Sequence, residues 1–216
     1  MSKTALIVVD IQNDFARVDG SLSVPHGGEV IPIINTLRQS VPFDLVVLTQ
    51  DYHPKGHISF YSTHATDRKA KLFQPYQLPD GKVQVLWPDH CVQGTFGAEI
   101  HLDLKQEPSD VFIQKGKQLT ADSYSAFLDN DRISKTDMEK VLHEHEISRV
   151  VIVGLALDYC VGYTALDAKA VGFDVVICKD ATKSVHDNSE KQMLHMLEKQ
   201  GIPCIDSSSY IRSNTF

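Results

Sequence analysis

The chain has 216 residues, of which 42% are hydrophobic and 23% charged, and its formal net charge is −7 at pH 7. This length suits one large domain, and the acidic balance argues against nucleic acid or an anionic membrane as the main partner. The four cysteines form no CxxC pair, and no apolar run is long enough to span a bilayer. We therefore expect a single domain over residues 1–216, without a signal peptide, in the reducing cytoplasm.

Short apolar runs recur along the chain, with helix-like segments between them. The runs are rich in Val and Ile and are continuous rather than alternating, which is typical of parallel strands covered on both faces. They predict strands at 5–11, 44–51, 110–116, 149–156 and 173–181.

Between these strands, apolar residues recur at three- and four-residue spacing, which predicts helices over 29–39, 135–146 and 189–200. Ser134 is expected to cap the second of these helices, and a fourth helix is expected to begin near Cys160. Alternating strands and helices indicate right-handed crossovers. The expected fold is therefore a doubly wound, mostly parallel α/β sheet with helices on both faces.

Polar residues follow four of the predicted strands. Asp10, Asp51 and Lys115 end the first three, and Cys160 follows the fourth in the stretch GLALDYC. Binding and active sites of open α/β sheets lie beyond the carboxyl ends of the strands, so we expect these side chains to meet at one edge. Each alone has a structural explanation, as a cap, an ion pair or a small buried hydrophobe, but the four groups are chemically complementary.

A cysteine in the first turn of a helix faces unsatisfied N–H groups, which favour the thiolate. The thiolate is the form that attacks a carbonyl carbon, so Cys160 needs a base and a positive charge nearby. We expect Asp10 to accept the proton and Lys115 to balance the charge, although a purely structural ion pair between them is an equal alternative. Asp158, in the same helical turn, is expected to oppose the thiolate slightly.

A second group of candidate residues lies around the connection at 52–109, whose length indicates a functional segment or short hidden elements. Asp51 and His53 are two residues apart at a strand end, which directs both side chains to one side, and His90 lies further along. Carboxylate oxygen and imidazole nitrogen suit Zn²⁺, Mn²⁺ or Fe²⁺. Cys91 is a weaker candidate ligand than His90, and the spare histidines are expected at the surface: His57, His64 and His101.

Five stretches carry a family resemblance: VVDIQNDF, TQDYHPKGHISF, WPDHCVQGTFGAE, KGKQLTADSYSAF and VGLALDYCVGYTALDAKAVGF. In their order and in their residues they resemble the nicotinamidases among the isochorismatase-like cysteine hydrolases. The resemblance extends from about residue 4 to residue 205. The resemblance implies the isochorismatase-like hydrolase fold and the hydrolysis of nicotinamide to nicotinic acid and ammonia in NAD salvage. Tyr52, Leu155 and Asp158 depart from common family residues but leave the expected catalytic and ligand positions unchanged.

The resemblance also implies a role for each residue at the strand ends. Cys160 would attack the carboxamide carbon, Asp10 would act as base and then as acid, and Lys115 would steady the charged pair. The backbone N–H groups of Ala156 and Cys160 would stabilise the oxyanion. A cis peptide bond is expected between Leu155 and Ala156.

The metal in this family holds the pyridine ring nitrogen, which implies a substrate-binding role for one divalent ion on Asp51, His53 and His90. Zn is the first expectation for this ion, with Fe or Mn as alternatives. Pyrazinamide is expected as a further substrate, and a homo-oligomer stays open. The residues expected to line the substrate are Phe15, Leu22, Trp87, Tyr124, Leu155 and Ala156.

Three other interpretations stay open at this point. A related isochorismatase-like amidase would act on another small amide. A metal-dependent hydrolase would attack with a metal-bound hydroxide and leave Cys160 structural. A binding protein would use the pocket without turnover.

Overall fold

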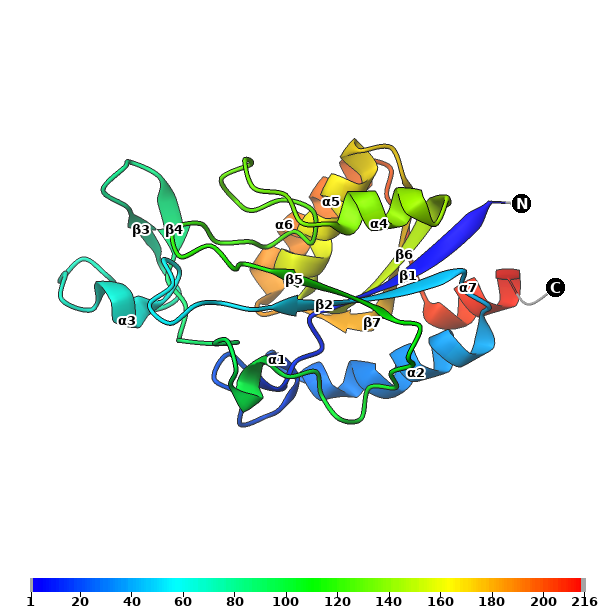
Figure 1. The fold of residues 1–216 in the computed structure, drawn as a ribbon, viewed down its shortest axis with the longest axis horizontal. Helices are drawn as coiled ribbons and strands as arrows, with labels where there is room; N and C mark the ends of the chain where they lie inside the picture. Colours follow the sequence, from blue (N-terminus) through cyan, green and yellow to red (C-terminus); the bar gives the residue numbers. More distant parts are fainter. Residues whose placement is uncertain (1, 215–216) are drawn as a thin grey trace.

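A six-stranded sheet forms the centre of the protein, in a computed structural model that describes residues 2–214. Its neighbouring strands are parallel and follow the order β5-β2-β1-β6-β7-β8 (Figure 1). This arrangement confirms the expected fold class. The strands are β1 (Lys3–Val9), β2 (Leu45–Asp51), β5 (Val111–Lys115), β6 (Ile147–Leu155), β7 (Asp174–Lys183) and β8 (Cys204–Ile205).

Helices cover both faces of this sheet (Figure 1). On one face lie α4 (Met138–Glu144), α5 (Gly162–Ala170) and α6 (Asp187–Lys199). On the other face lie α1 (Asn13–Ala16), α2 (Val30–Ser40) and α7 (Ser207–Asn214).

Residues of β1 alternate between two hydrophobic cores, because successive side chains of a strand point to opposite faces. Ala5 and Ile7 enter the core under α5, whereas Leu6 and Val8 enter the core under α2. A strand that is apolar on both faces is continuous in sequence, which is why its pattern did not alternate.

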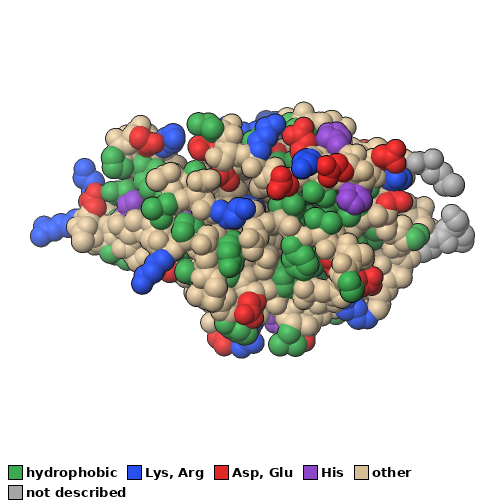
Figure 2. All heavy atoms as spheres, viewed as in Figure 1, with side chains coloured by type: hydrophobic (Ala, Val, Ile, Leu, Met, Phe, Trp, Pro, Cys, Tyr) green, Lys and Arg blue, Asp and Glu red, His purple; other side chains and the backbone are tan. Residues whose placement is uncertain are grey.

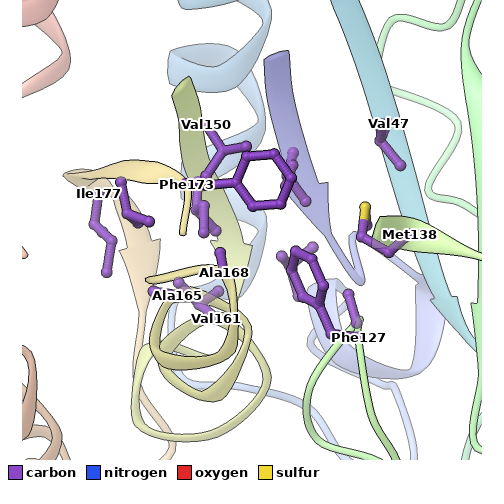
Figure 3. Packing of buried hydrophobic residues seen from close by; sticks show 14 of the residues in the cluster. Val47, Phe127, Met138, Val150, Val161, Ala165, Ala168, Phe173 and Ile177 are labelled. Carbon is purple, nitrogen blue, oxygen red and sulfur yellow. The ribbon is translucent and has the colours of Figure 1, made fainter. Parts of the chain in front are cut away.

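Small side chains let α5 approach the sheet closely. Ala165 and Ala168 lie on the inner side of the helix, and Phe173 fills the space beside Val150 (Figure 3). Full burial of a larger side chain such as Val150 or Phe173 contributes roughly 1.5–3 kcal/mol to folding. The packing therefore fixes the helix that follows Cys160 relative to the strand ends.

The five predicted strands are present, with ends within two residues of the predicted ones. The helix predicted over 135–146 is shorter, because it begins at Met138 with Asp137 at its N-cap position. Ser134 as its cap is therefore wrong, and the Ser134 carbonyl instead accepts a hydrogen bond from Asp129 N at 2.9 Å. The chain after β6 first forms a π-helical turn at Leu157–Val161, before α5.

The connection at 52–109 contains short elements and extends beyond one end of the sheet (Figure 1). These elements are α3 (Tyr61–His64), the paired strands β3 (Pro75–Gln77) and β4 (Val83–Val85), and the 3-10 turn η2 (Phe96–Ala98). A further 3-10 turn, η1 (Gly27–Glu29), precedes α2. The connection carries Trp87 and His90 back to the sheet edge.

The outer surface is of mixed charge. On the face drawn in Figure 2, acidic and basic side chains are interspersed rather than gathered by sign. None of the helices in the described chain combines the length and the apolar character that crossing a membrane requires.

Candidate active site

Side chains from three strand ends meet the turn that follows β6. Asp10 comes directly after β1, whereas Asp51 and Lys115 are the last residues of β2 and β5. Cys160 reaches the same place from the π-helical turn. The structure thus brings together the four groups that the strand ends indicated, and all four are buried.

Lys115 lies at the centre of this group. Its Nζ is 2.9 Å from Asp10 Oδ2 and 3.4 Å from Cys160 Sγ, and it forms a second ion pair with Asp51. It also donates to the Ser123 carbonyl at 2.9 Å. Burial lowers the pKa of Lys115, but these acidic neighbours outweigh burial and hold its pKa well above the ordinary value. Lys115 is therefore a fixed positive charge.

Burial governs the protonation of the two groups beside it. It raises the pKa of Asp10, against the opposing charge of Lys115 and a hydrogen bond of 2.5 Å from Thr49 Oγ1. It also raises the pKa of Cys160 well above the ordinary value, and Lys115 offsets only part of this. Burial thus opposes the thiolate that the helical turn was expected to favour. The thiol needs a base, and Asp10 lies within 4.8 Å of its sulfur.

Asp158 binds the start of α6, and the expectation that it opposes the thiolate stays a prediction. Its carboxylate accepts hydrogen bonds from Val185 N at 3.0 Å, His186 N at 3.2 Å and Ser189 Oγ at 2.5 Å. Three donors satisfy this buried carboxylate. These hydrogen bonds therefore stabilise the packing of α6 against the turn that carries Cys160.

The peptide bond between Leu155 and Ala156 is cis, as the resemblance predicts. The Ala156 carbonyl accepts hydrogen bonds from Tyr159 N and Val161 N, each at 3.1 Å. These bonds hold the turn around Cys160. The oxyanion role of the Ala156 and Cys160 N–H groups stays a prediction.

A candidate metal centre adjoins Lys115. Asp51 Oδ2 lies 3.4 Å from His53 Nε2 and 3.9 Å from His90 Nε2. The other ring nitrogens face backbone carbonyls, with His53 Nδ1 2.8 Å from Gly116 O and His90 Nδ1 2.7 Å from Pro88 O. A carbonyl can only accept, so both Nδ1 atoms carry the proton and both Nε2 lone pairs are available to a metal.

The chemistry of these three residues fits a divalent ion. His53 Nε2 is buried and has no hydrogen-bond partner in the described chain, an arrangement that a metal ligand explains. Burial would raise the pKa of Asp51, but Lys115 and His53 lower it below its usual range, and burial lowers the pKa of His90 to about 4. A Cβ on Gly116 would overlap the His53 ring, so glycine is required there. A carboxylate and two imidazoles suit Zn²⁺, Fe²⁺ or Mn²⁺.

The expectation that His57 lies at the surface is wrong. It is fully buried, and its ring stacks on that of His53 with centroids 4.1 Å apart. Its Nε2 donates to Ala121 O at 3.1 Å and its Nδ1 bonds to Ser59 Oγ at 2.7 Å, so neither nitrogen is available to a metal. His64 and His101 are partly buried. Cys91, the weaker candidate ligand, is buried and lies outside the metal-capable group of Asp51, His53 and His90.

One cavity of about 450 Å³, including its open mouth, joins the thiol to the metal-capable residues. Its wall includes Cys160, Asp51 and His90. All six residues predicted to line the substrate are in the wall: Phe15, Leu22, Trp87, Tyr124, Leu155 and Ala156. Sequence reasoning missed four more, Val24, Asp122, Tyr159 and Val185.

Asp122 is the most consequential of the missed residues. Its carboxylate accepts a hydrogen bond from Gln84 Nε2 at 2.8 Å and one from Ser123 N at 2.8 Å. Donors therefore bind both oxygens of this carboxylate, which lies in the cavity wall. It lies within 4.8 Å of a nitrogen of His53. Its place in the stretch ADSYSAF, seven residues after Lys115, was the only available signal.

A parallel α/β sheet that gathers a thiol, a carboxylate and an ammonium beside a metal-capable group defines the class of cysteine hydrolases. The particular family follows from comparison with known proteins. The Isochorismatase domain family matches residues 4–209, and the chain belongs to this family.

Relatives and solved structures within this family are similar over nearly their whole length. A nicotinamidase of Acinetobacter baylyi is 45% identical over 188 residues, which cover 87% of this chain and 85% of the relative. The structure of an Acinetobacter baumannii nicotinamidase and pyrazinamidase has a TM-score of 0.89 at 40% identity, covering 97% and 99% of the two chains. A pyrazinamidase of Pyrococcus horikoshii, solved in complex with zinc, has a TM-score of 0.77 at 34% identity, covering 94% and 99%.

Proposed function

We propose that this chain hydrolyses nicotinamide to nicotinic acid and ammonia through Cys160. The observation that carries this proposal is the single cavity that joins the Cys160 thiol to the ring-binding group of Asp51 and His90. An aromatic amide would place its carboxamide at the thiol end of this cavity and its ring nitrogen at the end with Asp51 and His90. The nicotinamidase from Acinetobacter baylyi, at 45% identity, supports this choice of amide.

The first half-reaction begins from a neutral thiol. The proton of Cys160 Sγ passes to the Asp10 carboxylate while the sulfur attacks the carboxamide carbon and forms a C–S bond. The carbonyl oxygen becomes an oxyanion that accepts hydrogen bonds from the N–H groups of Ala156 and Cys160. Asp10 then gives its proton to the departing nitrogen, the C–N bond breaks, and ammonia leaves a thioester on Cys160.

In the second half-reaction, water hydrolyses the thioester. Asp10 takes a proton from the water as its oxygen attacks the acyl carbon. The C–S bond then breaks, Asp10 gives this proton to the leaving sulfur, and nicotinic acid is released. Lys115 stays positive throughout and stabilises whichever of Asp10 and Cys160 carries the negative charge.

Substrate orientation comes from the rest of the cavity. A divalent ion held by Asp51, His53 and His90 would supply a Lewis-acid contact for the ring nitrogen. We propose Zn²⁺, since a zinc complex is known for the Pyrococcus horikoshii relative, with Fe²⁺ and Mn²⁺ as alternatives. The aromatic side chains of Phe15, Trp87 and Tyr124, with Leu22 and Leu155, exclude water from the ring. Pyrazinamide carries the same ring nitrogen and carboxamide, so we propose it as a second substrate.

Two further proposals concern the domain organisation and the cellular location of the chain. We propose that residues 1–216 form one domain, because the main helices pack against one sheet. We also propose a cytoplasmic location, which the free state of Cys91, Cys160, Cys178 and Cys204 supports.

The test is ammonia release from nicotinamide by the purified protein. Cys160→Ala should abolish release, whereas Cys178→Ala, which removes another buried thiol from β7, should retain it. Stripping the metal with a chelator should lower the rate, and added Zn²⁺ should restore it. Release by Cys160→Ala would instead indicate a metal-hydroxide hydrolase. No release by the wild type with metal restored would indicate another small amide as substrate.

A further inference from the structure

The ladder between β1 and β2 ends before it reaches the candidate metal ligand Asp51. Its last paired residues are Val8 and Leu48. The chain then turns away at Asp10, whose φ is 48°. The backbone N–H and C=O of Asp51 that face β1 therefore have no strand partner, although Asp51 is buried.

The side chain of Gln12 takes the place of the missing strand. Its Oε1 accepts a hydrogen bond from Asp51 N at 2.8 Å, and its Nε2 donates to Asp51 O at 2.8 Å and to Ala98 O at 2.9 Å. Gln12 is fully buried. The side-chain amide thus acts as one further peptide group of the ladder and fixes the backbone of Asp51.

Asp14 fixes the backbone beside the second imidazole ligand. Its Oδ2 accepts a hydrogen bond from Cys91 N at 2.7 Å, directly after His90, and its Oδ1 accepts one from Ser21 N at 3.3 Å. Gly97 packs against this carboxylate, and a Cβ there would overlap it.

We infer that Gln12 and Asp14 are positioning residues that set the metal affinity of the site. The inference rests on the proposed metal centre, and neither residue belongs to the metal-capable group of Asp51, His53 and His90. Segment 10–14 carries the proposed catalytic base, Asp10. It also aligns two proposed metal ligands, Asp51 on β2 and His90 on the connection after β4. Loss of a group that orients a metal ligand typically costs 10–100-fold in affinity.

The test is the Kd for Zn²⁺ of the metal-stripped full chain, measured by competition with a chromophoric chelator. Gln12→Met keeps the length of the side chain but removes its hydrogen bonds, and it should raise the Kd about 10–100-fold. Asp14→Ala should do the same. Asp14→Asn keeps an oxygen that can accept from Cys91 N, so it should restore most of the affinity.

Asn35→Leu is the matched control. Asn35 clamps another backbone segment in the same way, with Nδ2 donating to Asp103 O at 2.8 Å and Oδ1 accepting from Lys105 N at 2.9 Å. It belongs to α2, outside the metal-capable group, so the variant should keep the wild-type Kd even where its Tm falls.

Three results would overturn the inference. The first is that Gln12→Met and Asp14→Ala both keep the wild-type Kd within twofold, and the second is that Asn35→Leu weakens binding as much as they do. In either case the metal centre stands and only the positioning role fails. A wild-type chain that binds no Zn²⁺ would overturn the metal centre as well. If Gln12→Met does not fold, the comparison of Asp14→Ala with Asp14→Asn decides.

Discussion

Replacing Lys115 by Met should destabilise the metal-free protein severely. The side chain is buried, and its ammonium is the cation that pairs with both Asp10 and Asp51, which are 0% and 3% exposed. Its removal leaves two buried carboxylates without that partner. Breaking a buried ion pair from one side costs about 3–5 kcal/mol. This corresponds to roughly two to four powers of ten in the unfolding equilibrium.

The loss should depend on pH. Burial already raises the pKa of Asp10 in the wild type, and the charge of Lys115 limits that rise. Without Lys115, the folded-state pKa rises further above the unfolded value. A raised folded-state pKa gives stability that is present at low pH and is lost as the pH rises through it. The variant should therefore lose more stability at pH 8 than at pH 5.

Urea unfolding in the presence of a chelator, at both pH values, measures this loss. Lys117→Met is the matched control, because Lys117 is two residues away and exposed. A loss of unfolding free energy below about 1 kcal/mol at pH 8 is the range of an exposed ion pair. It would refute the assignment of Lys115 as the cation that neutralises Asp10 and Asp51. So would a loss equal to that of Lys117→Met.

Three further predictions follow from buried groups. Alkylation of Cys160 by iodoacetamide should be slow at pH 7 and still rise beyond pH 9, because burial raises its pKa; a rate that levels off below pH 8 would contradict this. Asp158→Ala should lower the free energy of unfolding by about 2–3 kcal/mol, since the donors at the start of α6 lose their acceptor. Urea unfolding measures this loss, and ammonia release by the folded variant should change less than twofold. Burial raises the pKa of Cys178 to about 12, so wild-type stability should fall as the pH rises above 9, and Cys178→Ala should flatten that slope in urea titrations.

The sequence was sufficient wherever one strong local pattern decides the structure. The continuous apolar runs identified the parallel strands, and the residues at their ends identified Asp10, Asp51 and Lys115 as neighbours. The two-residue strand β8 has no such pattern, because Cys204 and Ile205 are too few to show a period. Its position depends on pairing with β7, which is a tertiary contact.

Protonation and burial were less predictable, because they depend on what surrounds a residue. The position of Cys160 in a first helical turn suggested a thiolate, but burial raises its pKa well above the ordinary value. His57 is buried because it stacks on His53 and bonds to the Ala121 carbonyl, 64 residues away. Gln12 gave no signal either, since its role depends on the residue at which β1 stops beside β2.

The charges around the cavity link these observations. Asp10, Asp51 and Asp122 supply three buried carboxylates, and Lys115 supplies one ammonium, so two negative charges are left uncompensated when all three carboxylates are ionised. Burial, together with Asp10 and Asp51, raises the pKa of the Cys160 thiol, and Lys115 offsets only part of this. At His53, burial lowers the pKa, but Asp51 more than offsets this and raises the pKa above the ordinary value. A divalent cation on Asp51, His53 and His90 would add the two positive charges that these side chains lack.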